Sequence, residues 1–392
     1  MADTADKVVK IKVIGVGGAG NNVINRMIAS DVKGVEFVAV NTDKQDLEKS
    51  KCKNKVQIGE KLTGGMGAGS KPDIGQKSAE ESKALISQVL EGTDMVFITA
   101  GMGGGTGTGA APIIAQVAHD AGILTVAVVT KPFRFEGANR MKQAEAGIAN
   151  LSDKVDSLII IPNDRLKFVT DQKITFANAF GIADDVLKQA VSSISELVGY
   201  SENVIINLDF ADVSAIMRNA GQAHMGVGRA AGKGKAEDAA RMAVASPLME
   251  TSINGARGVL INITGSEDMG LEDVETAANL VQEAAHPDAN IIFGASFDPS
   301  LDDEIRVSVI ATGFDEPGKA QAEAAPAAAA APAAAPAAGM YSAAATAATA
   351  APAAAPAPAA APAAPAAAPA ADAAAPAEED PFDSIFKIFN SK

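Results

Sequence analysis

The sequence predicts an α/β protein in which helices cover both faces of a parallel, doubly wound sheet. Two observations support this fold. Short apolar runs alternate with amphipathic helical segments up to about residue 174, and glycine-rich stretches follow several of these runs. A third observation divides the rest of the chain: a long helical pattern, a smaller region of mixed strands and helices, and an abrupt change to Ala and Pro near residue 316.

The composition limits the possible functions. The 392 residues carry a formal charge of −15, which argues against nucleic-acid binding through a basic surface. The one cysteine, Cys52, cannot form an intrachain disulfide and fits a reducing cytoplasm. The first residues lack the apolar core of a signal peptide, and no run of about twenty apolar residues is free of Gly or charge. We therefore expect a cytoplasmic protein without a membrane span.

The first strand, at residues 8–16, leads into the glycine-rich stretch 15–20, which fits G-x-G-x-x-G before an amphipathic helix. The next strand, at 36–40, is followed by Asn41-Thr42-Asp43, so an acidic residue stands where a dinucleotide site would hold a ribose. Taken alone, the first fifty residues also support a Rossmann oxidoreductase that binds NAD.

Two further glycine-rich stretches favour a nucleoside triphosphate instead. Residues 64–72 lead into a predicted helix at 73–91, and residues 103–109 lie between a strand at 95–100 and a helix that opens at Ala110. Five glycines in seven residues are costly to order unless the backbone must approach a ligand closely. Backbone N–H groups at a helix N-terminus suit phosphate. The chain has no G-x-x-x-x-G-K-[ST], so a P-loop lysine is absent.

The remaining pattern completes two folded regions. Strands at 123–129 and 155–161 and a helix at 138–151 continue the first sheet, and the three glycine stretches should meet at its carboxyl edge. A helix at 175–198, roughly 36 Å long, follows. Beyond it, the sequence predicts a smaller mixed sheet that ends in a pair of strands. Its predicted helices are 241–248 and 271–285, and its predicted strands are 257–264, 290–297 and 305–313.

The last part of the chain has two kinds of sequence. Residues 316–377 are almost wholly Ala and Pro, which predicts a disordered tether because no apolar pattern is available to bury. In residues 378–392, four apolar side chains recur at helical spacing behind Asp380 and Pro381, which predicts a short amphipathic helix that docks on a partner.

Several motifs together resemble one family, the FtsZ family of tubulin-like GTPases, from about residue 9 to residue 314. GGGTGTG at 103–109 is typical of the tubulin/FtsZ superfamily, while KPFRFEG at 131–137 and NLDFADV at 207–213 point to FtsZ itself. GVGGAGNN at 15–22 and GGMGAGSKP at 64–72 agree with this resemblance. It implies a tubulin-like fold that binds GTP or GDP.

The resemblance implies three phosphate-binding loops. The first loop consists of Gly18, Ala19, Gly20, Asn21 and Asn22. The loop for the γ-phosphate consists of Ala68, Gly69 and Ser70. The loop for the α- and β-phosphates consists of Gly104, Gly105, Thr106, Gly107 and Thr108. The same resemblance implies ribose contacts from Glu136 and Arg140, and guanine contacts from Asn163, Phe180 and Asp184. An aromatic ring offers a stacking face, and Asn or Asp can pair with the guanine edge. Helical periodicity alone would place Phe180 in the core.

The resemblance also implies that hydrolysis of GTP to GDP and phosphate depends on assembly. Asn207, Asp209 and Asp212 would dock onto the nucleotide of the next subunit and position the attacking water, with Mg²⁺ offsetting phosphate charge. The pattern does not identify ligands for Mg²⁺. Without the resemblance, Asp209 and Asp212 would be interpreted as N-capping residues of a helix.

The implied organisation has five parts. They are a GTP-binding domain (8–174), a central helix with its connection (175–203), a C-terminal GTPase-activating domain (204–315), the linker (316–377) and the partner-binding peptide (378–392). The resemblance implies head-to-tail filaments in the division ring at mid-cell, with the peptide binding division proteins and membrane tethers. The peptide departs from the family's usual proline-containing, basic motif. A tubulin-like filament of a plasmid or phage remains an alternative.

Overall fold

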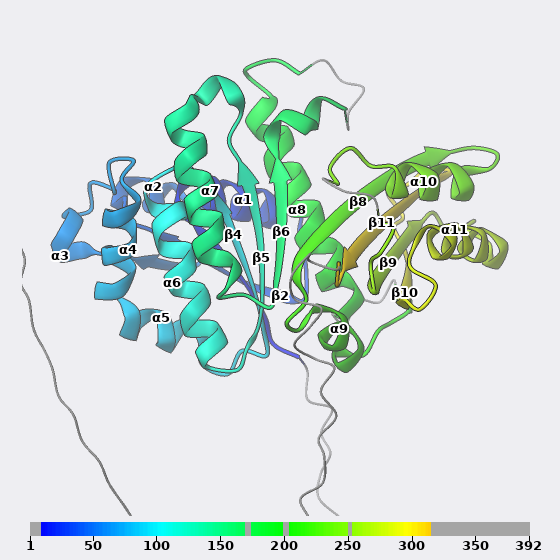
Figure 1. Ribbon diagram of the computed structural model, residues 1–392, viewed down its shortest axis with the longest axis horizontal. Helices are drawn as coiled ribbons and strands as arrows, with labels where there is room; N and C mark the ends of the chain where they lie inside the picture. The colour runs from blue at the N-terminus through cyan, green and yellow to red at the C-terminus, as the bar shows by residue number, and fades with distance from the viewer. Residues whose placement is uncertain (1–8, 169–173, 199–203, 250–252, 315–392) are drawn as a thin grey trace, which may run out of the picture. The chain divides into compact units, whose positions relative to one another are not determined.

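The computed structural model describes residues 9–168, 174–198, 204–249 and 253–314. The predicted linker and terminal peptide lie outside the described residues. In the N-terminal part, six parallel strands form one sheet in the order β3-β2-β1-β4-β5-β6 (Figure 1). The strands are β1 (Ile11–Val16), β2 (Val35–Asn41), β3 (Asn54–Gln57), β4 (Met95–Gly101), β5 (Leu124–Lys131) and β6 (Ser157–Pro162). The strand order reverses between β1 and β4, which confirms the predicted doubly wound sheet.

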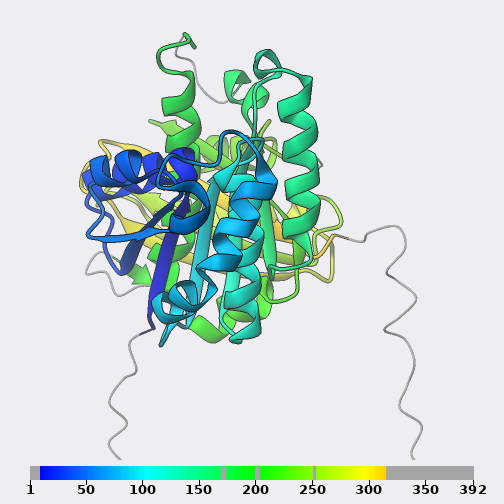
Figure 2. The same cartoon turned by 90° about the vertical axis from the view of Figure 1, so that its left-hand side faces the viewer.

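Helices cover both faces of this sheet. The N-terminal part of the chain, coloured blue and cyan, faces the viewer in Figure 2. On one face, Ile11 and Val13 of β1 share a core with α1 (Gly17–Ala29), α2 (Lys44–Lys49) and α8 (Ala179–Val198). On the other face, Ile14 and Val16 share a core with four helices. These are α4 (Pro72–Glu81), α5 (Lys83–Leu90), α6 (Thr106–Asp120) and α7 (Ala138–Ser152); the short α3 (Glu60–Thr63) precedes them. Because both faces are covered, β1 carries apolar side chains on both faces, with Lys12 as the one charged residue.

Helix boundaries differ from the predictions where polar side chains and glycines intervene. The single helix predicted at 73–91 is divided at Ser82, whose hydroxyl accepts a hydrogen bond from Gly59 N at 3.0 Å. The helix predicted from Thr175 begins at Ala179, because the Asn178 side chain accepts from Thr175 N at 2.6 Å and favours a turn. Helix α6 begins at Thr106, four residues before the predicted start, so the glycine stretch enters its first turn.

The C-terminal part continues the sheet in the order β6-β8-β11-β9-β10-β7. Its elements are β7 (Val204–Ile206), α9 (Phe210–Met217), β8 (Gly221–Ala231), α10 (Lys235–Val244), β9 (Gly258–Gly265), α11 (Leu271–Ala284), β10 (Asn290–Phe297) and β11 (Glu304–Thr312). Strands β9 and β10 are parallel, whereas β11 is antiparallel to both β8 and β9, so the predicted mixed sheet is confirmed. The predicted final strand pair is wrong, because β11 lies between β8 and β9 rather than beside β10.

The sequence pattern misplaced α10 and missed two strands of this region, the short β7 and the long β8. The helix predicted at 241–248 is α10, which begins six residues earlier and ends at Val244. Strand β8 was not predicted, since its glycines lower its strand propensity. Gly226 and Gly228 are needed there because a methyl group on either would collide with the backbone of α10, at Ala243 and Ala239.

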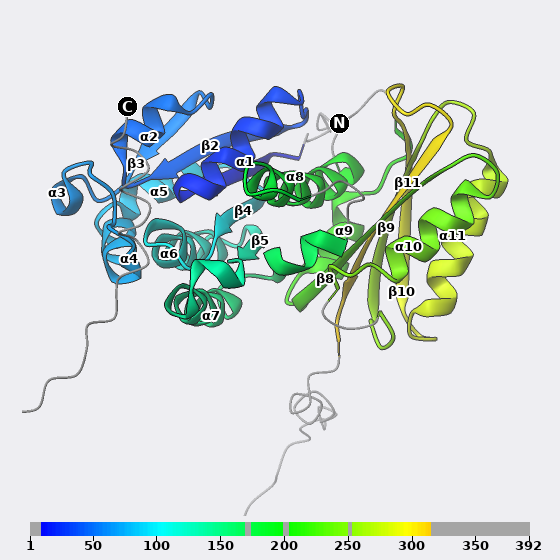
Figure 3. The same ribbon diagram turned by 90° about the horizontal axis from the view of Figure 1, so that it is seen from above.

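Helix α8 joins the two parts of the sheet into one core (Figure 3). Its buried Ile194 and Leu197 belong to the same cluster as Val126 of β5 and Leu260 of β9. The long central helix predicted from the sequence is therefore confirmed, although it begins later than expected. Among the described helices, none is both long and apolar enough to span a bilayer.

Candidate functional site

The three glycine stretches meet at the carboxyl edge of the parallel strands, as the sequence predicts. A methyl group placed on Gly17 would lie 3.0 Å from Gly107 N, and one on Gly101 would lie 2.8 Å from the Ala19 Cβ. The third stretch is equally close, because a methyl group on Gly105 would lie 2.8 Å from the Ala68 Cβ. Any larger residue at these positions would force the loops apart.

Two helices begin inside this cluster. Helix α1 starts at Gly17 and α6 at Thr106, so the unpaired N–H groups of both first turns point toward the same edge. Gly103 has a left-handed backbone (φ 97°), which turns the chain at the end of β4, and nothing lies within 4 Å of a methyl group placed on Gly104. Such an open backbone cradle at two positive helix ends is suited to the phosphates of a ligand.

The polar residues of the first and second loops differ in their exposure. Asn21 is buried, and in the described structure neither atom of its side-chain amide has a hydrogen-bond partner. Its neighbours Gly18, Ala19 and Asn22 are exposed. Thr108 is buried and accepts from Gly103 N at 2.8 Å, so its oxygen closes the second loop internally. A buried amide without a partner costs about 1–3 kcal/mol, which a bound polar ligand would offset.

The third loop has an unusual backbone. Gly69 (φ 57°) and Ser70 (φ 58°) are both left-handed, and Ser70 is one of four residues other than glycine with this conformation in the described chain. Both are exposed, whereas Ala68 is buried against Gly105. The strained turn presents the loop's tip to solvent beside the second loop.

Glu136 and Arg140 form a pair next to the second loop. Arg140 Nε lies 3.1 Å from Glu136 Oε2, and the other carboxylate oxygen accepts from Phe133 N at 2.8 Å. A methyl group on Gly103 would lie 2.7 Å from the Arg140 side chain, so the pair directly adjoins the glycine stretch. The Glu136 carboxylate is held in place by both bonds.

Asn163, Phe180 and Asp184 lie near the start of the central helix and the end of β6. Asn163 is buried with its side-chain oxygen unpartnered within the described residues. The Phe180 ring is 43% exposed and meets the Phe133 ring edge-to-face, with centroids 5.6 Å apart. The ring is therefore not a core side chain, contrary to its helical periodicity.

The carboxylate of Asp184 is already engaged by a cation. Arg26 Nε lies 3.2 Å from Asp184 Oδ2, and Arg26 also reaches Asp185 at 3.3 Å. Burial raises the pKa of Asp184 to about 6, although Arg26 acts in the opposite direction. Proton uptake near pH 6 would therefore change the hydrogen-bonding character of this carboxyl group.

Asp43, the acidic residue that follows β2, has a structural role in the fold. Its side chain accepts from Asp46 N at 3.1 Å and caps α2. Sequence reasoning assigned no ligand role to the rest of the segment after β2, in which the Thr42 hydroxyl lies 2.6 Å from the Thr106 hydroxyl. The G-x-G-x-x-G stretch is a feature that this chain shares with dinucleotide-binding proteins.

The residues expected to catalyse hydrolysis lie at the other edge of the sheet. Asn207, Asp209 and Asp212 are exposed around the start of α9. Helix α9 ends at the amino edge of the parallel strands, because Ser157 Oγ, at the start of β6, donates to Met217 O at 2.6 Å. Asp209 occupies the N-cap position but makes no side-chain cap bond, so its carboxylate is not used by the helix.

The two edges are far apart within one chain. The eight residues of β5 separate them, which corresponds to roughly 26 Å. The structure therefore brings together the residues predicted for the phosphates, but it does not bring Asn207, Asp209 or Asp212 to them.

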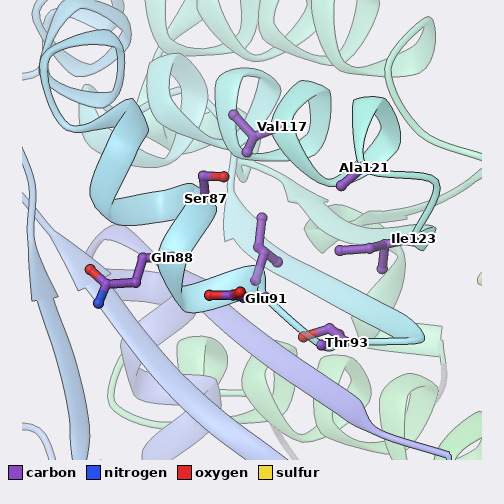
Figure 4. Close-up of a pocket in the computed structure, with 9 residues that line it drawn as sticks. Ser87, Gln88, Glu91, Thr93, Val117, Ala121 and Ile123 are labelled. Atoms are coloured by element: carbon purple, nitrogen blue, oxygen red, sulfur yellow. The ribbon is translucent and has the colours of Figure 1, made fainter.

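Other hollows lie away from the glycine loops. A cavity of 480 Å³ at the amino edge, between α5 and α6, is lined by Ser87, Glu91, Thr93 and Val117 among others (Figure 4). A groove of 620 Å³ runs between α11 and β10, and an adjoining hollow of 360 Å³ includes Asp212. None of these contains a residue predicted for nucleotide binding.

Among the described residues, no three or more His, Cys, Asp or Glu side chains group closely enough to hold a metal ion. The open cradle near Gly104 is suited to phosphate oxygens, which are the ligands Mg²⁺ prefers in nucleotide sites.

The chain resembles known proteins over most of its length. Residues 10–171 match the GTPase domain of the Tubulin/FtsZ family, and residues 221–315 match the C-terminal domain of the FtsZ family. An empty FtsZ dimer from M. jannaschii is 44% identical, with a TM-score of 0.75, over 78% of this chain and 88% of that one. CetZ2 from Haloferax volcanii, solved as a GTPgS-bound protofilament, shares the fold at 23% identity and a TM-score of 0.65, over 78% of this chain and 94% of that one. Together with the phosphate cradle, these similarities show that the chain belongs to the FtsZ family of tubulin-like GTPases.

Proposed function

We propose that this protein is a GTPase that polymerises head to tail into the filaments of the bacterial division ring and hydrolyses GTP between subunits. One observation carries the proposal: the nucleotide cradle and the acidic residues of NLDFADV occupy opposite edges of the same sheet. In a head-to-tail stack, the amino edge of one subunit meets the carboxyl edge of the next. Such a heterologous contact does not close on itself and produces a filament.

The residues then divide into two sets of roles. Asn21, the glycine loops and Thr106 bind the phosphates, Glu136 and Arg140 bind the ribose, and Asn163, Phe180 and Asp184 bind guanine. Across the contact, Asn207, Asp209 and Asp212 position and polarise the attacking water. Mg²⁺ on the phosphates would offset their charge and make phosphorus more electrophilic.

The wider biology follows from the same proposal. We assign the filaments to the cytoplasm at mid-cell. Within each subunit, the GTP-binding domain spans 8–174, the central helix with its connection 175–203, and the C-terminal GTPase-activating domain 204–315. The linker 316–377 would tether the peptide 378–392, which binds division proteins and membrane tethers. The similar M. jannaschii FtsZ was solved as a dimer and CetZ2 as a protofilament, which supports self-association.

A sedimentation assay tests the proposal. GTP should move the protein into the pellet while GDP leaves it in solution, and phosphate release per subunit should rise steeply above a threshold protein concentration. A competition assay with ATP and NAD provides the specificity control. GTPase activity strictly proportional to protein concentration down to dilute monomer would refute assembly-dependent catalysis. Preferential binding of NAD over GTP would favour the oxidoreductase hypothesis instead. A plasmid or phage filament would share this biochemistry and differ in its cellular location.

A further inference from the structure

The segment directly after β2 contacts two of the glycine loops through a single residue, Thr42. Its side chain is fully buried, and its hydroxyl lies 2.6 Å from the Thr106 hydroxyl of the second loop. Its backbone carbonyl accepts from Gly67 N of the third loop at 3.2 Å. Thr42 therefore connects the loop assigned to the α- and β-phosphates with the loop assigned to the γ-phosphate.

The segment is held rigidly around Thr42. Asn41 Oδ1 accepts from Thr42 N at 2.9 Å, and Asn41 Nδ2 donates to Asp46 Oδ2 at 2.7 Å. The same Asp46 oxygen would lie 3.5 Å from a methyl group placed on Gly18 of the first loop. These bonds hold Thr42 between the second and third loops, and Asp46 provides the contact with the first loop.

Each of the two threonine hydroxyl groups has a single hydrogen, which limits how the two groups can be hydrogen-bonded. In the described structure the buried Thr42 hydroxyl has only the Thr106 oxygen as a partner. The Thr42 side chain is fully buried, so leaving its hydrogen unpaired would be costly. The geometry alone allows either hydroxyl to donate, and the burial of Thr42 favours Thr42 as the donor and Thr106 as the acceptor. The hydrogen of Thr106, which is half-buried at the first position of α6, is then left for a ligand.

We propose that Thr42 is a positioning residue, which orients the Thr106 hydroxyl as a donor to a nucleotide phosphate and ties this donor to the third loop. This inference rests on the proposed function of the site. Thr42 itself does not touch the nucleotide; it acts through Thr106.

A double-mutant cycle tests this assignment in the full-length protein. Thr42→Val keeps the shape of the side chain and the backbone bonds but removes the donor hydroxyl. We expect GTP and GDP to bind the Thr42→Val protein roughly 2- to 12-fold more weakly, as for the loss of one hydrogen bond. Thr106→Val should cause a similar loss, and the double variant should bind no more weakly than Thr106→Val alone. Thr42→Ser, which retains the hydroxyl, should restore affinity. The Asp212→Ala background is used throughout, so that GTP persists during the measurement.

The outcomes separate this inference from others. Additive losses in the double variant would overturn it, as would a Thr42→Ser protein that binds as weakly as Thr42→Val. A lowered melting temperature shared by the Val and Ser variants would indicate a purely structural role and also overturn it. If the parent protein binds neither GTP nor GDP, the proposed function itself fails, and that result is recognised without any variant.

Discussion

Asp212→Ala gives the sharpest test of a site shared between subunits. The side chain is exposed in the first turn of α9, so its removal should cost at most about 1 kcal/mol of folding stability through the helix dipole. GTP binding should be unchanged because the nucleotide cradle lies at the other edge of the sheet. Turnover should fall by roughly 10²–10⁴-fold, the usual contribution of a positioned acid–base group. Phosphate release and nucleotide binding are measured on the same preparation.

A mixing experiment separates the shared site from one contained in a single chain. The second variant is Gly107→Val, whose Cβ would lie 2.8 Å from Gly101 O and distort the cradle while leaving Asp212 intact. Neither variant should hydrolyse GTP alone. In an equal mixture, a competent contact needs the nucleotide from one variant and Asp212 from the other, so activity should return to at most about a quarter of wild type.

The control for this experiment is Asp238→Ala, which removes another exposed carboxylate from the first turn of a helix, α10. It should lose the same small amount of stability and retain full turnover. Wild-type hydrolysis by Asp212→Ala would refute the reasoning. Failure of two folded variants to complement each other, with the Asp212→Ala protein shown to bind GTP, would refute it equally.

Three other predictions concern the central helix and the C-terminal sheet. The pKa of Asp184 is raised to about 6, so the folded protein binds one more proton than the unfolded chain between about pH 4 and 6. The free energy of unfolding should therefore fall as pH rises through this window. Urea titrations at several pH values should show this fall in the parent and a flatter profile in Asp184→Asn. GTP affinity should weaken as pH falls below 6 in the parent but not in Asp184→Asn, and an unchanged parent affinity would contradict the guanine contact. Ile194→Ala, at a fully buried position, should cost about 2–5 kcal/mol of unfolding free energy by chemical denaturation, whereas Phe180→Ala on the same helix should cost far less but weaken GTP binding; equal stability losses would contradict the assigned burial. Gly226→Ala should destabilise the protein by about 1–3 kcal/mol because its Cβ would collide with Ala243 O, and a melting temperature equal to wild type would show that α10 can move away.

Sequence patterns predicted the parallel sheet well because both its faces are covered. Strands such as β4 are mostly apolar on both faces, and each strand of the doubly wound part is followed by a segment with helical spacing. Strand β8 could not be predicted in this way, because its glycines allow α10 to pack closely against it. A close approach between segments that are distant in the sequence leaves no periodic pattern of apolar residues. The division of α4 from α5 at Ser82 likewise depends on a bond to Gly59, 23 residues away.

The candidate site was predictable only in part. Glycine-rich loops after strands mark the phosphate edge locally, and the resemblance supplied the remaining residues. The exposure of Phe180 could not be read from its helical spacing, since Ala179 and Ala183 on either side of it are buried and only the ring itself is exposed. Thr42 carries no local signal either, since its partner Thr106 is 64 positions away.

The position of β11 has a consequence for how the C-terminal sheet is made. This strand is the last in the chain order, yet it is inserted between β8 and β9, and its partner residues in β8 precede it by more than seventy positions. Until β11 arrives, both neighbours present bare edges with unpaired N–H and C=O groups, which invite pairing with other chains. Closing such a long-range pairing is slow. During synthesis, the half-built C-terminal sheet would therefore be open to pairing with other chains until β11 has emerged.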